Sequence, residues 1–179
     1  MSQAEKTERI LEDWEKPGRI HLHGLVGDYD LKEERQRLRS LPRVIRSDEL
    51  PWKGGPRMFN KTLLSARSNG PQSIYVHLKE FLPGTASQLH GHQNPALMYV
   101  LQGKGYDIQD GERIDWQAGD LAVIQDGTVH QHFCISDVPA RVLIFKPKSL
   151  YMFANLIYQG LVKPADKTPL QGWEGYLPD

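Results

Sequence analysis

The fold is decided by the stretch GTASQLHGHQNPALMYVLQG, residues 84–103. It places an H-x-H pair, His90 and His92, ahead of an apolar run that ends at a glycine. Alternate side chains of a β-strand lie on the same face, so both imidazoles can point toward one centre. The apolar run between turn residues predicts a strand over 96–102. The stretch therefore predicts strands that carry a polar site.

A second pair, His130 and His132, follows in the stretch GDLAVIQDGTVHQH, residues 119–132. Strand parity places both histidines on the same face as Thr128 and Cys134. Imidazole is the commonest metal ligand near neutral pH. Three or four convergent histidines suit zinc, copper, iron or nickel better than magnesium or calcium. The two pairs together predict a transition-metal site.

The two stretches resemble the two motifs of the cupin superfamily. The first motif is Gly, five residues, H-x-H, then a later Glu and Gly; the second is Gly, five residues, P-x-G, two residues, His. Here Gln125 replaces the proline, and Ala96 stands where the carboxylate ligand would be. The resemblance covers residues 73–147. It implies an all-β cupin fold, a double-stranded β-helix or jelly-roll barrel.

Within the cupins, an H-x-H followed after three residues by Ala-Leu is similar to the gentisate 1,2-dioxygenase group. Those enzymes hold iron with three histidines and no carboxylate, and their second motif also reads H-x-H. Two features depart from that group: Met98 stands where it commonly has arginine, and the chain is shorter than the usual two-cupin chain.

The resemblance implies that His90, His92 and His130 are the metal ligands. Iron(II) is the expected metal, with zinc, nickel, copper and manganese as other divalent candidates. His132 has three possible roles: a fourth ligand, an acid–base group, or a hydrogen-bond partner of the substrate. The acid–base or substrate role is favoured.

Four residues beside the first pair are expected to contact substrate. Ala96 leaves free volume beside the metal, Met98 packs on the substrate, and Gln93 and Asn94 touch substrate or oxygen. The alternative for Gln93 and Asn94 is ordinary turn chemistry. A cation that binds a substrate carboxylate is expected among four side chains, which sequence alone does not separate: Arg57, Arg67, Lys79 and Arg141.

Three neutral ligands leave the charge of the metal uncompensated and several coordination positions open. Such a site favours an anionic substrate that chelates through two oxygens, with a position left for dioxygen. We therefore expect a metal-dependent dioxygenase that cleaves a carbon–carbon bond in a hydroxylated aromatic acid or a related chelating ketone or enol. The alternative is an oxygen-independent isomerase or lyase, or a cupin that binds a small ligand without catalysis.

Composition narrows the class of protein. Lysine plus arginine equals aspartate plus glutamate at 22 each in 179 residues, so nothing indicates a nucleic-acid surface. No apolar run reaches the length of a membrane span, and the polar N-terminal sequence predicts a cytoplasmic protein. The single cysteine, Cys134, excludes an internal disulfide. Sheet edges that need covering favour a homodimer.

Three segments are expected along the chain. Residues 1–60 are expected to form an N-terminal extension with helices over 3–16 and 29–40. Residues 61–148 are expected to form the cupin barrel. Residues 149–179 are expected to form a C-terminal helix, over 148–160, and a tail. The predicted strands are 73–82, 96–102, 106–109, 112–115, 121–124, 128–134 and 141–146. A third H-x-H pair, His21 and His23, is expected in a loop or lid, and His77 is expected to be structural or exposed.

Overall fold

The computed structural model describes residues 33, 36, 39–66 and 73–179. The chain divides into two compact units, Met1–Leu41 and Pro42–Asp179, and every strand belongs to the second. The helix predicted over 3–16 and the pair His21 and His23 lie outside the described residues, as does most of the helix predicted over 29–40.

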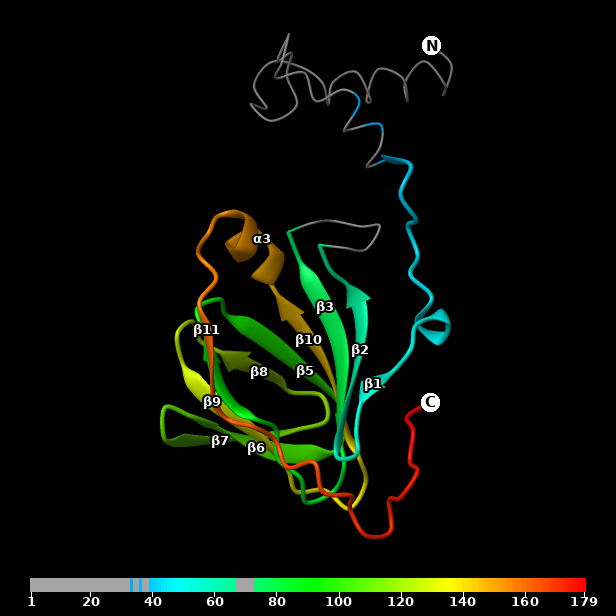
Figure 1. Ribbon diagram of the computed structural model, residues 1–179, viewed down its shortest axis with the longest axis vertical. Coiled ribbons are helices and arrows are strands. Elements are labelled where there is room, and N and C mark those ends of the chain that lie inside the picture. Colours follow the sequence, from blue (N-terminus) through cyan, green and yellow to red (C-terminus); the bar gives the residue numbers. More distant parts are fainter. Residues whose placement is uncertain (1–32, 34–35, 37–38, 67–72) are drawn as a thin grey trace. The chain divides into compact units, whose positions relative to one another are not determined.

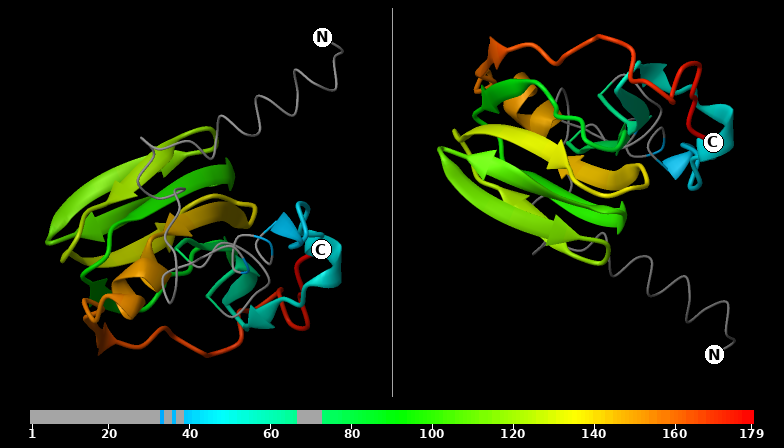
Figure 2. Two further views of the ribbon diagram at one scale, coloured as in Figure 1. Left: turned by 90° about the horizontal axis from the view of Figure 1, so that it is seen from above. Right: turned by 90° about the horizontal axis from the view of Figure 1, so that it is seen from below.

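The second unit consists of two antiparallel sheets (Figure 1). The first has the order β1 (Lys53–Gly54), β2 (Met58–Leu64), β3 (Tyr75–Phe81), β10 (Ala140–Lys146), β5 (Ala96–Gln102), β8 (Leu121–Ile124). The second has the order β11 (Gln159–Lys163), β4 (Leu89–His92), β9 (Val129–Cys134), β6 (Lys104–Gln109), β7 (Glu112–Gln117). The end-on views of Figure 2 show the strands curving around a common interior. The prediction of an all-β barrel is confirmed.

The strands alternate between the interior and solvent as the sequence predicted. In β5, Ala96, Met98 and Val100 are buried while the residues between them are exposed. These three pack in a core cluster that also contains Trp116 of β7 and Cys134 of β9. Side chains of both sheets therefore fill one end of the interior, and burial of this apolar surface supplies the main stabilisation.

The tight hairpin between β6 and β7 forms where Asp110 and Gly111 predicted it. Both residues have positive φ, 48° and 90°. A two-residue hairpin with positive φ at both central positions matches the right-handed twist of the paired strands, and glycine adopts that conformation without steric cost.

The C-terminal region differs from the prediction of one helix over 148–160. Helix α3 (Lys148–Phe153) ends early, and Asn155 adopts a positive φ of 60°. The chain then turns back, and β11 pairs with β4 in antiparallel register. The barrel was predicted to start at residue 61. The structure begins earlier: a 3-10 turn, η2 (Ser47–Glu49), and strand β1 precede residue 61, and strand β2 spans it.

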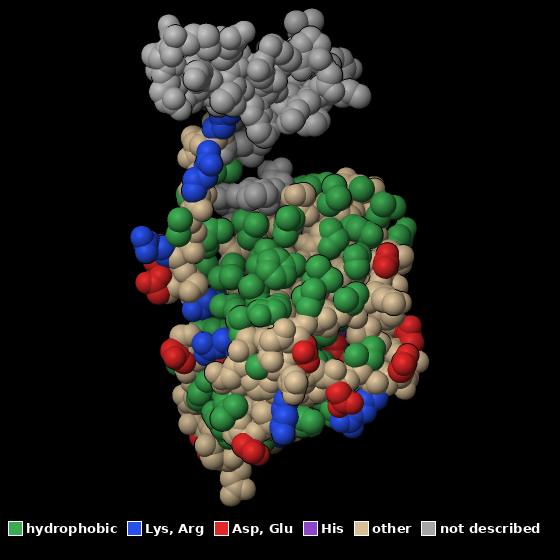
Figure 3. Space-filling model, turned by 180° about the vertical axis from the view of Figure 1, so that it is seen from behind, with side chains coloured by type: hydrophobic (Ala, Val, Ile, Leu, Met, Phe, Trp, Pro, Cys, Tyr) green, Lys and Arg blue, Asp and Glu red, His purple; other side chains and the backbone are tan. Residues whose placement is uncertain are grey.

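The outer face of the six-stranded sheet is apolar across three strands. In the register of β10, β5 and β8, Leu97 lies between Phe145 and Val123, and Tyr99 lies between Leu143 and Leu121. Apart from the half-buried Leu143 these side chains are exposed, and Figure 3 shows hydrophobic side chains gathered on one face. Among the described residues no helix has the length and apolarity to cross a membrane.

Candidate metal centre

Three histidines from two neighbouring strands converge inside the barrel. His90 and His92 lie on β4, and His130 lies on β9 directly opposite His90 in the antiparallel register. Each histidine offers one ring nitrogen, and these atoms lie within 4.8 Å of one another. His92 and His130 are buried and His90 is half-buried. Both histidines of β4 join the cluster, only His130 of β9 does, and the pairing of the two strands brings them together.

Each ring of the cluster is oriented by its own backbone neighbourhood. In all three, Nδ1 lies within hydrogen-bond distance of a carbonyl oxygen two residues away: Gln88 at 3.2 Å from His90, Asn94 at 2.6 Å from His92, and Thr128 at 3.2 Å from His130. A carbonyl only accepts, so Nδ1 carries the proton and Nε2 keeps its lone pair. A hydrogen bond on the far nitrogen is how proteins fix the tautomer and orientation of metal-binding histidines.

Burial keeps the three rings neutral. It lowers the pKa of His90 to about 3, of His92 to about 4 and of His130 to about 2, and neighbouring positive charges add to the effect. A neutral imidazole is the form that binds a metal. The residues therefore fit a divalent transition metal in number, protonation and orientation.

The side-chain amine of Lys146 contacts the ring nitrogen of His92 that would bind a metal. Its Nζ lies 3.1 Å from His92 Nε2, the lone pair that would bind the metal. Burial, and then the charges of Lys79 and Lys148, lower the pKa of Lys146 to about 7. A metal bound to His92 would have to replace this contact, and the lowered pKa of Lys146 weakens the charge repulsion that opposes the metal.

His132, the neighbour of the cluster on β9, has a partner of its own. Its Nδ1 donates to Asp107 Oδ1 at 2.8 Å, and the same oxygen accepts a hydrogen bond from Trp116 Nε1 at 2.8 Å. The carboxyl is fully buried, and its pKa is lowered by His132 and by these hydrogen bonds, which outweigh the opposing effect of burial. The ring of His132 lies 5.3 Å from that of His130, outside the three-histidine cluster.

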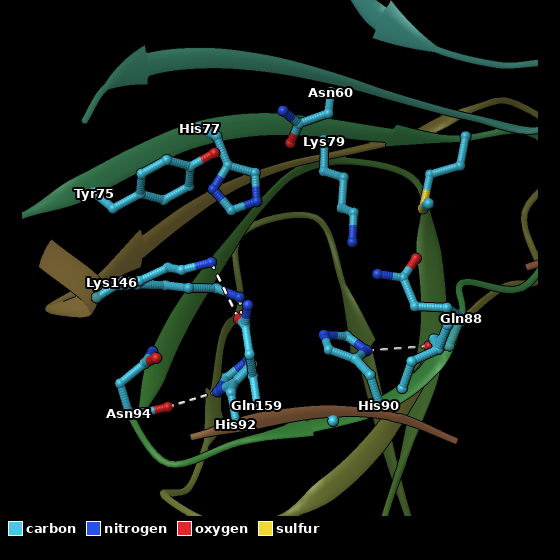
Figure 4. A pocket seen from close by; sticks show the side chains of 14 residues that line it. Asn60, Tyr75, His77, Lys79, Gln88, His90, His92, Asn94, Lys146 and Gln159 are labelled. Carbon is cyan, nitrogen blue, oxygen red and sulfur yellow. Dashed lines mark hydrogen bonds between the residues drawn. The ribbon is translucent and has the colours of Figure 1, made fainter. Parts of the chain in front are cut away.

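A cavity of about 630 Å³ opens beside the cluster. Strands of both sheets, with α3 and the segment before β4, supply its wall, and Figure 4 shows its side chains. Its described lining comprises Met58, Asn60, Tyr75, His77, Lys79, Gln88, His90, His92, Asn94, Lys146, Lys148, Gln159, Gly160 and Leu161. Most of these side chains are polar, and Met98, which was expected to pack on the substrate, is not among them.

The lining is cationic. It contains three lysines and no aspartate or glutamate among the described residues. Burial lowers the pKa of Lys79 to about 8, although Asp107 pulls it upward. Removing an ammonium from water is costly unless an anion compensates it. The cavity is therefore arranged to accept negative charge next to the histidine cluster.

Three of the four residues predicted to touch substrate lie outside the described lining, and Asn94 lies in it. Ala96 and Met98 belong to the apolar core, and Gln93 is exposed; none is in the described lining of the cavity. The Oδ1 of Asn94 is buried and has no hydrogen-bond partner among the described residues.

The structure separates the four candidate cations. Lys79 lines the cavity. Arg57 pairs with Asp166 at 3.0 Å, Arg141 pairs with Glu80 at 2.6 Å, and Arg67 lies outside the described residues.

Sequence reasoning missed most of the wall formed by β2, β3 and β10. On β3, Tyr75, His77 and Lys79 alternate with Val76 and Leu78, a period-two signal for a polar face inside the barrel. The expectation for His77 is half correct: it is buried, at 5% exposure, but it lines the cavity, and its Nδ1 has no partner in the part of the chain that the structure describes.

Comparisons with known proteins agree with this architecture. Residues 77–146 match the cupin domain family. Gentisate 1,2 dioxygenase 1 of Aquipseudomonas alcaligenes is 37% identical over 68 residues, which cover 37% of this chain and 20% of that protein. The match thus spans about a fifth of that relative.

Two solved structures share the fold. Salicylate 1,2-dioxygenase from Pseudoaminobacter salicylatoxidans, as adducts with gentisate, superposes with a TM-score of 0.55 at 14% identity, over 83% of this chain and 42% of that one. A predicted oxalate decarboxylase from Thermotoga maritima superposes with a TM-score of 0.50 at 22% identity, over 57% of this chain and 96% of that one. The resemblance to cupins read from the two histidine motifs is confirmed, since residues 77–146 match the cupin domain family.

Proposed function

We propose that this cupin is a metal-dependent dioxygenase, with iron(II) as its metal, that cleaves a carbon–carbon bond in a hydroxylated aromatic acid or a related chelating ketone or enol. One observation carries the proposal: three neutral histidines converge without a carboxylate, and two of them, His90 and His92, line a cationic cavity. His90, His92 and His130 would hold the metal. The similarity to gentisate and salicylate dioxygenases supports the same reading.

When bound, the metal supplies positive charge, open coordination positions and redox chemistry with dioxygen. The chain supplies binding and orientation. The lysines of the cavity attract an anionic substrate, and the carbonyls that hold Nδ1 of each ligand keep the three rings fixed. Preorganised groups of this kind lower the cost of reaching the reactive geometry.

In this proposal His132 handles the substrate proton. Asp107 holds its Nδ1 proton, which leaves Nε2 to accept a proton from a substrate hydroxyl, although His132 is buried next to His130 and is not in the described lining of the cavity. A carboxylate that orients a histidine and stabilises its charged form is the usual support for a general base. Ala96, Met98 and Gln93 act only indirectly in this scheme, since the core and solvent surround them.

Oxygen consumption tests the function. Protein reconstituted anaerobically with iron(II) is mixed with gentisate, salicylates, hydroxynaphthoates, hydroxyacetophenones or β-diketones. We expect uptake with one class, stoichiometric with product. His132→Gln should keep the metal and lose turnover by about 10²- to 10⁴-fold, the usual contribution of a general base. No uptake across the panel with iron confirmed bound would replace this function by oxygen-independent isomerase or lyase chemistry, or by ligand binding alone.

We also propose that the chain works as a cytoplasmic homodimer with small-molecule partners alone, the substrate and dioxygen, and without nucleic acid or membrane. The exposed apolar face of β5, β8 and β10 carries the dimer proposal. Contiguous exposed apolar surface of this kind marks interaction sites. The face includes the edge strand β8, whose unpaired backbone groups also need a cover.

Tyr99→Glu should disrupt this dimer. A charge in the centre of an apolar interface is buried without a partner, and we expect the dissociation constant to rise by more than about 100-fold. Sedimentation equilibrium measures it. Leu177→Glu, at an exposed position in the C-terminal tail, is the control and should leave the mass unchanged. A monomeric wild-type protein, or a Tyr99→Glu dimer of unchanged affinity, would refute the proposal.

A further inference from the structure

Lys79 is a buried ammonium directed into the cavity. Its residue is 9% exposed, and the side chain projects from β3 toward the region of Gln88 and His90 (Figure 4). Its charge is among those that lower the pKa of His90, so the two groups share one electrostatic environment. The ammonium therefore faces the same space as the histidine cluster.

No anion in the described part of the chain pairs with Lys79. The described ion pairs and hydrogen bonds do not include its Nζ, which makes only a ring contact with Phe81 at 5.5 Å from the centroid. Asp107 influences its pKa, but the oxygens of that carboxylate are taken by His132, Trp116 and Gln109. Since a buried, uncompensated ammonium is costly, its place in the wall of a cavity points to a ligand that compensates it.

Lys79 also has suitable neighbours. Asn60 on β2 is its direct cross-strand partner and lines the same cavity, so an amide lies beside the ammonium. His77 is two residues along β3 on the same face, with an unpartnered buried Nδ1. An ammonium, an amide and an imidazole around one position offer several donors to a carboxylate, which accepts at two oxygens.

We propose that Lys79, with Asn60 and His77, forms a second anchoring site for substrate, so that the preferred substrate is a dianion: one oxygen-rich end at the histidine cluster and a second carboxylate at Lys79. The inference rests on the proposed function for the end at the cluster. It is independent of the oxygen chemistry, since a dianion can bind whether or not it reacts. A single carboxylate with a hydroxyl or ketone would fill only the first site and leave Lys79 uncompensated.

Matched pairs of ligands test the second site. The pairs are 2-oxopentanoate with 2-oxoglutarate, and salicylate with 5-carboxysalicylate; each shares a chelating end and differs by one distal carboxylate. Calorimetry at pH 7 uses protein loaded with nickel(II), which replaces iron without oxygen chemistry, and metal-free protein. We expect at least one dianion to bind about 10- to 100-fold more tightly than its partner, the worth of one charged hydrogen-bonded contact.

Lys79→Met keeps the length of the side chain and removes the charge. It should reduce the preference to within about twofold and leave the monoanion nearly unaffected, since only the distal contact is lost. Lys104→Met, on the exposed start of β6, is the control and should keep the full preference. Equal affinity of the wild-type protein for both members of both pairs would refute the second site without any variant. So would a Lys79→Met protein that weakens monoanion and dianion alike.

The outcome separates the two proposals. Failure of the wild-type protein to bind nickel(II) would remove the metal centre and with it the proposed function. A dianion preference that depends on Lys79 in metal-free protein would still establish the second site. Conversely, metal binding and oxygen uptake with a monoanion, without any dianion preference, would keep the function and overturn the second site.

Discussion

Replacing His130 by alanine will cost the protein its metal. The affinity for iron(II), and for zinc(II) as a redox-inert substitute, should fall by more than about 100-fold, because even a lost hydrogen bond behind a ligand costs about 10- to 100-fold. The loss is large since His90 and His92 alone would leave two ligands on one strand. Competition titration with a chromogenic chelator measures it, and oxygen uptake should vanish with the metal.

The matched control is His77→Ala, which removes a buried histidine that lines the cavity but lies outside the three-histidine cluster. His77 lies on β3 and does not belong to the three-histidine cluster. Its removal should leave metal affinity within about threefold, because no ligand is lost and neighbouring contributions are small by comparison. Equal losses for His77→Ala and His130→Ala would mean that the effect comes from the general structure of the pocket, and the assignment of ligands would be wrong.

The sequence was enough for the cluster because its geometry is local. Strand parity sets His90 beside His92, and the glycine-bounded motifs set the strands on which they lie. The pairing of His90 with His130 across β4 and β9 then needs only the antiparallel register of one strand pair. The strands over 96–102 and 121–124 were predicted to the residue for the same reason: apolar alternation between strong turn signals.

The wall of the cavity depends on distant contacts and was harder to predict. Parity correctly sends Ala96 and Met98 inward, but it does not say whether an inward side chain reaches the core end or the cavity end of the barrel. Lys146 is beside the cluster because β10 pairs with β3 and places it opposite Tyr75. A lysine at a strand end ordinarily predicts solvent, so only the long-range pairing reveals this one.

Nothing in the side-chain pattern of the sequence indicates strand β11. Its five residues are all exposed, so the alternation that reveals a half-buried strand is absent. It is nevertheless the strand next to β4, and Gln159, Gly160 and Leu161 complete the cavity. Backbone pairing to the edge of an existing sheet holds it in place, an interaction that side-chain patterns do not record.

Acid will unfold the metal-free protein at a pH where ordinary acidic groups are still ionised. Burial lowers the pKa of four histidines in and around the cavity: His77 and His130 to about 2, His90 to about 3 and His92 to about 4. In the unfolded chain each takes a proton near its ordinary pKa of 6.5. Between 6.5 and these lowered values the unfolded state binds more protons, so the free energy of unfolding falls as the pH falls.

The loss can reach about 1.4 kcal/mol per pH unit for each histidine that stays neutral in the folded state. Four such groups together would remove much of a typical free energy of unfolding of about 5–15 kcal/mol within two pH units.

Urea unfolding followed by circular dichroism from pH 7.5 to 4.5 measures the slope of the free energy of unfolding against pH. His77→Gln removes one titrating group and should make the slope shallower, whatever it does to stability at pH 7.5. A bound metal holds three of the rings deprotonated and should move the decline to lower pH. A free energy of unfolding that stays constant between pH 6.5 and 5 would show that the rings accept protons in the folded state, and would contradict the neutral cluster on which metal binding depends.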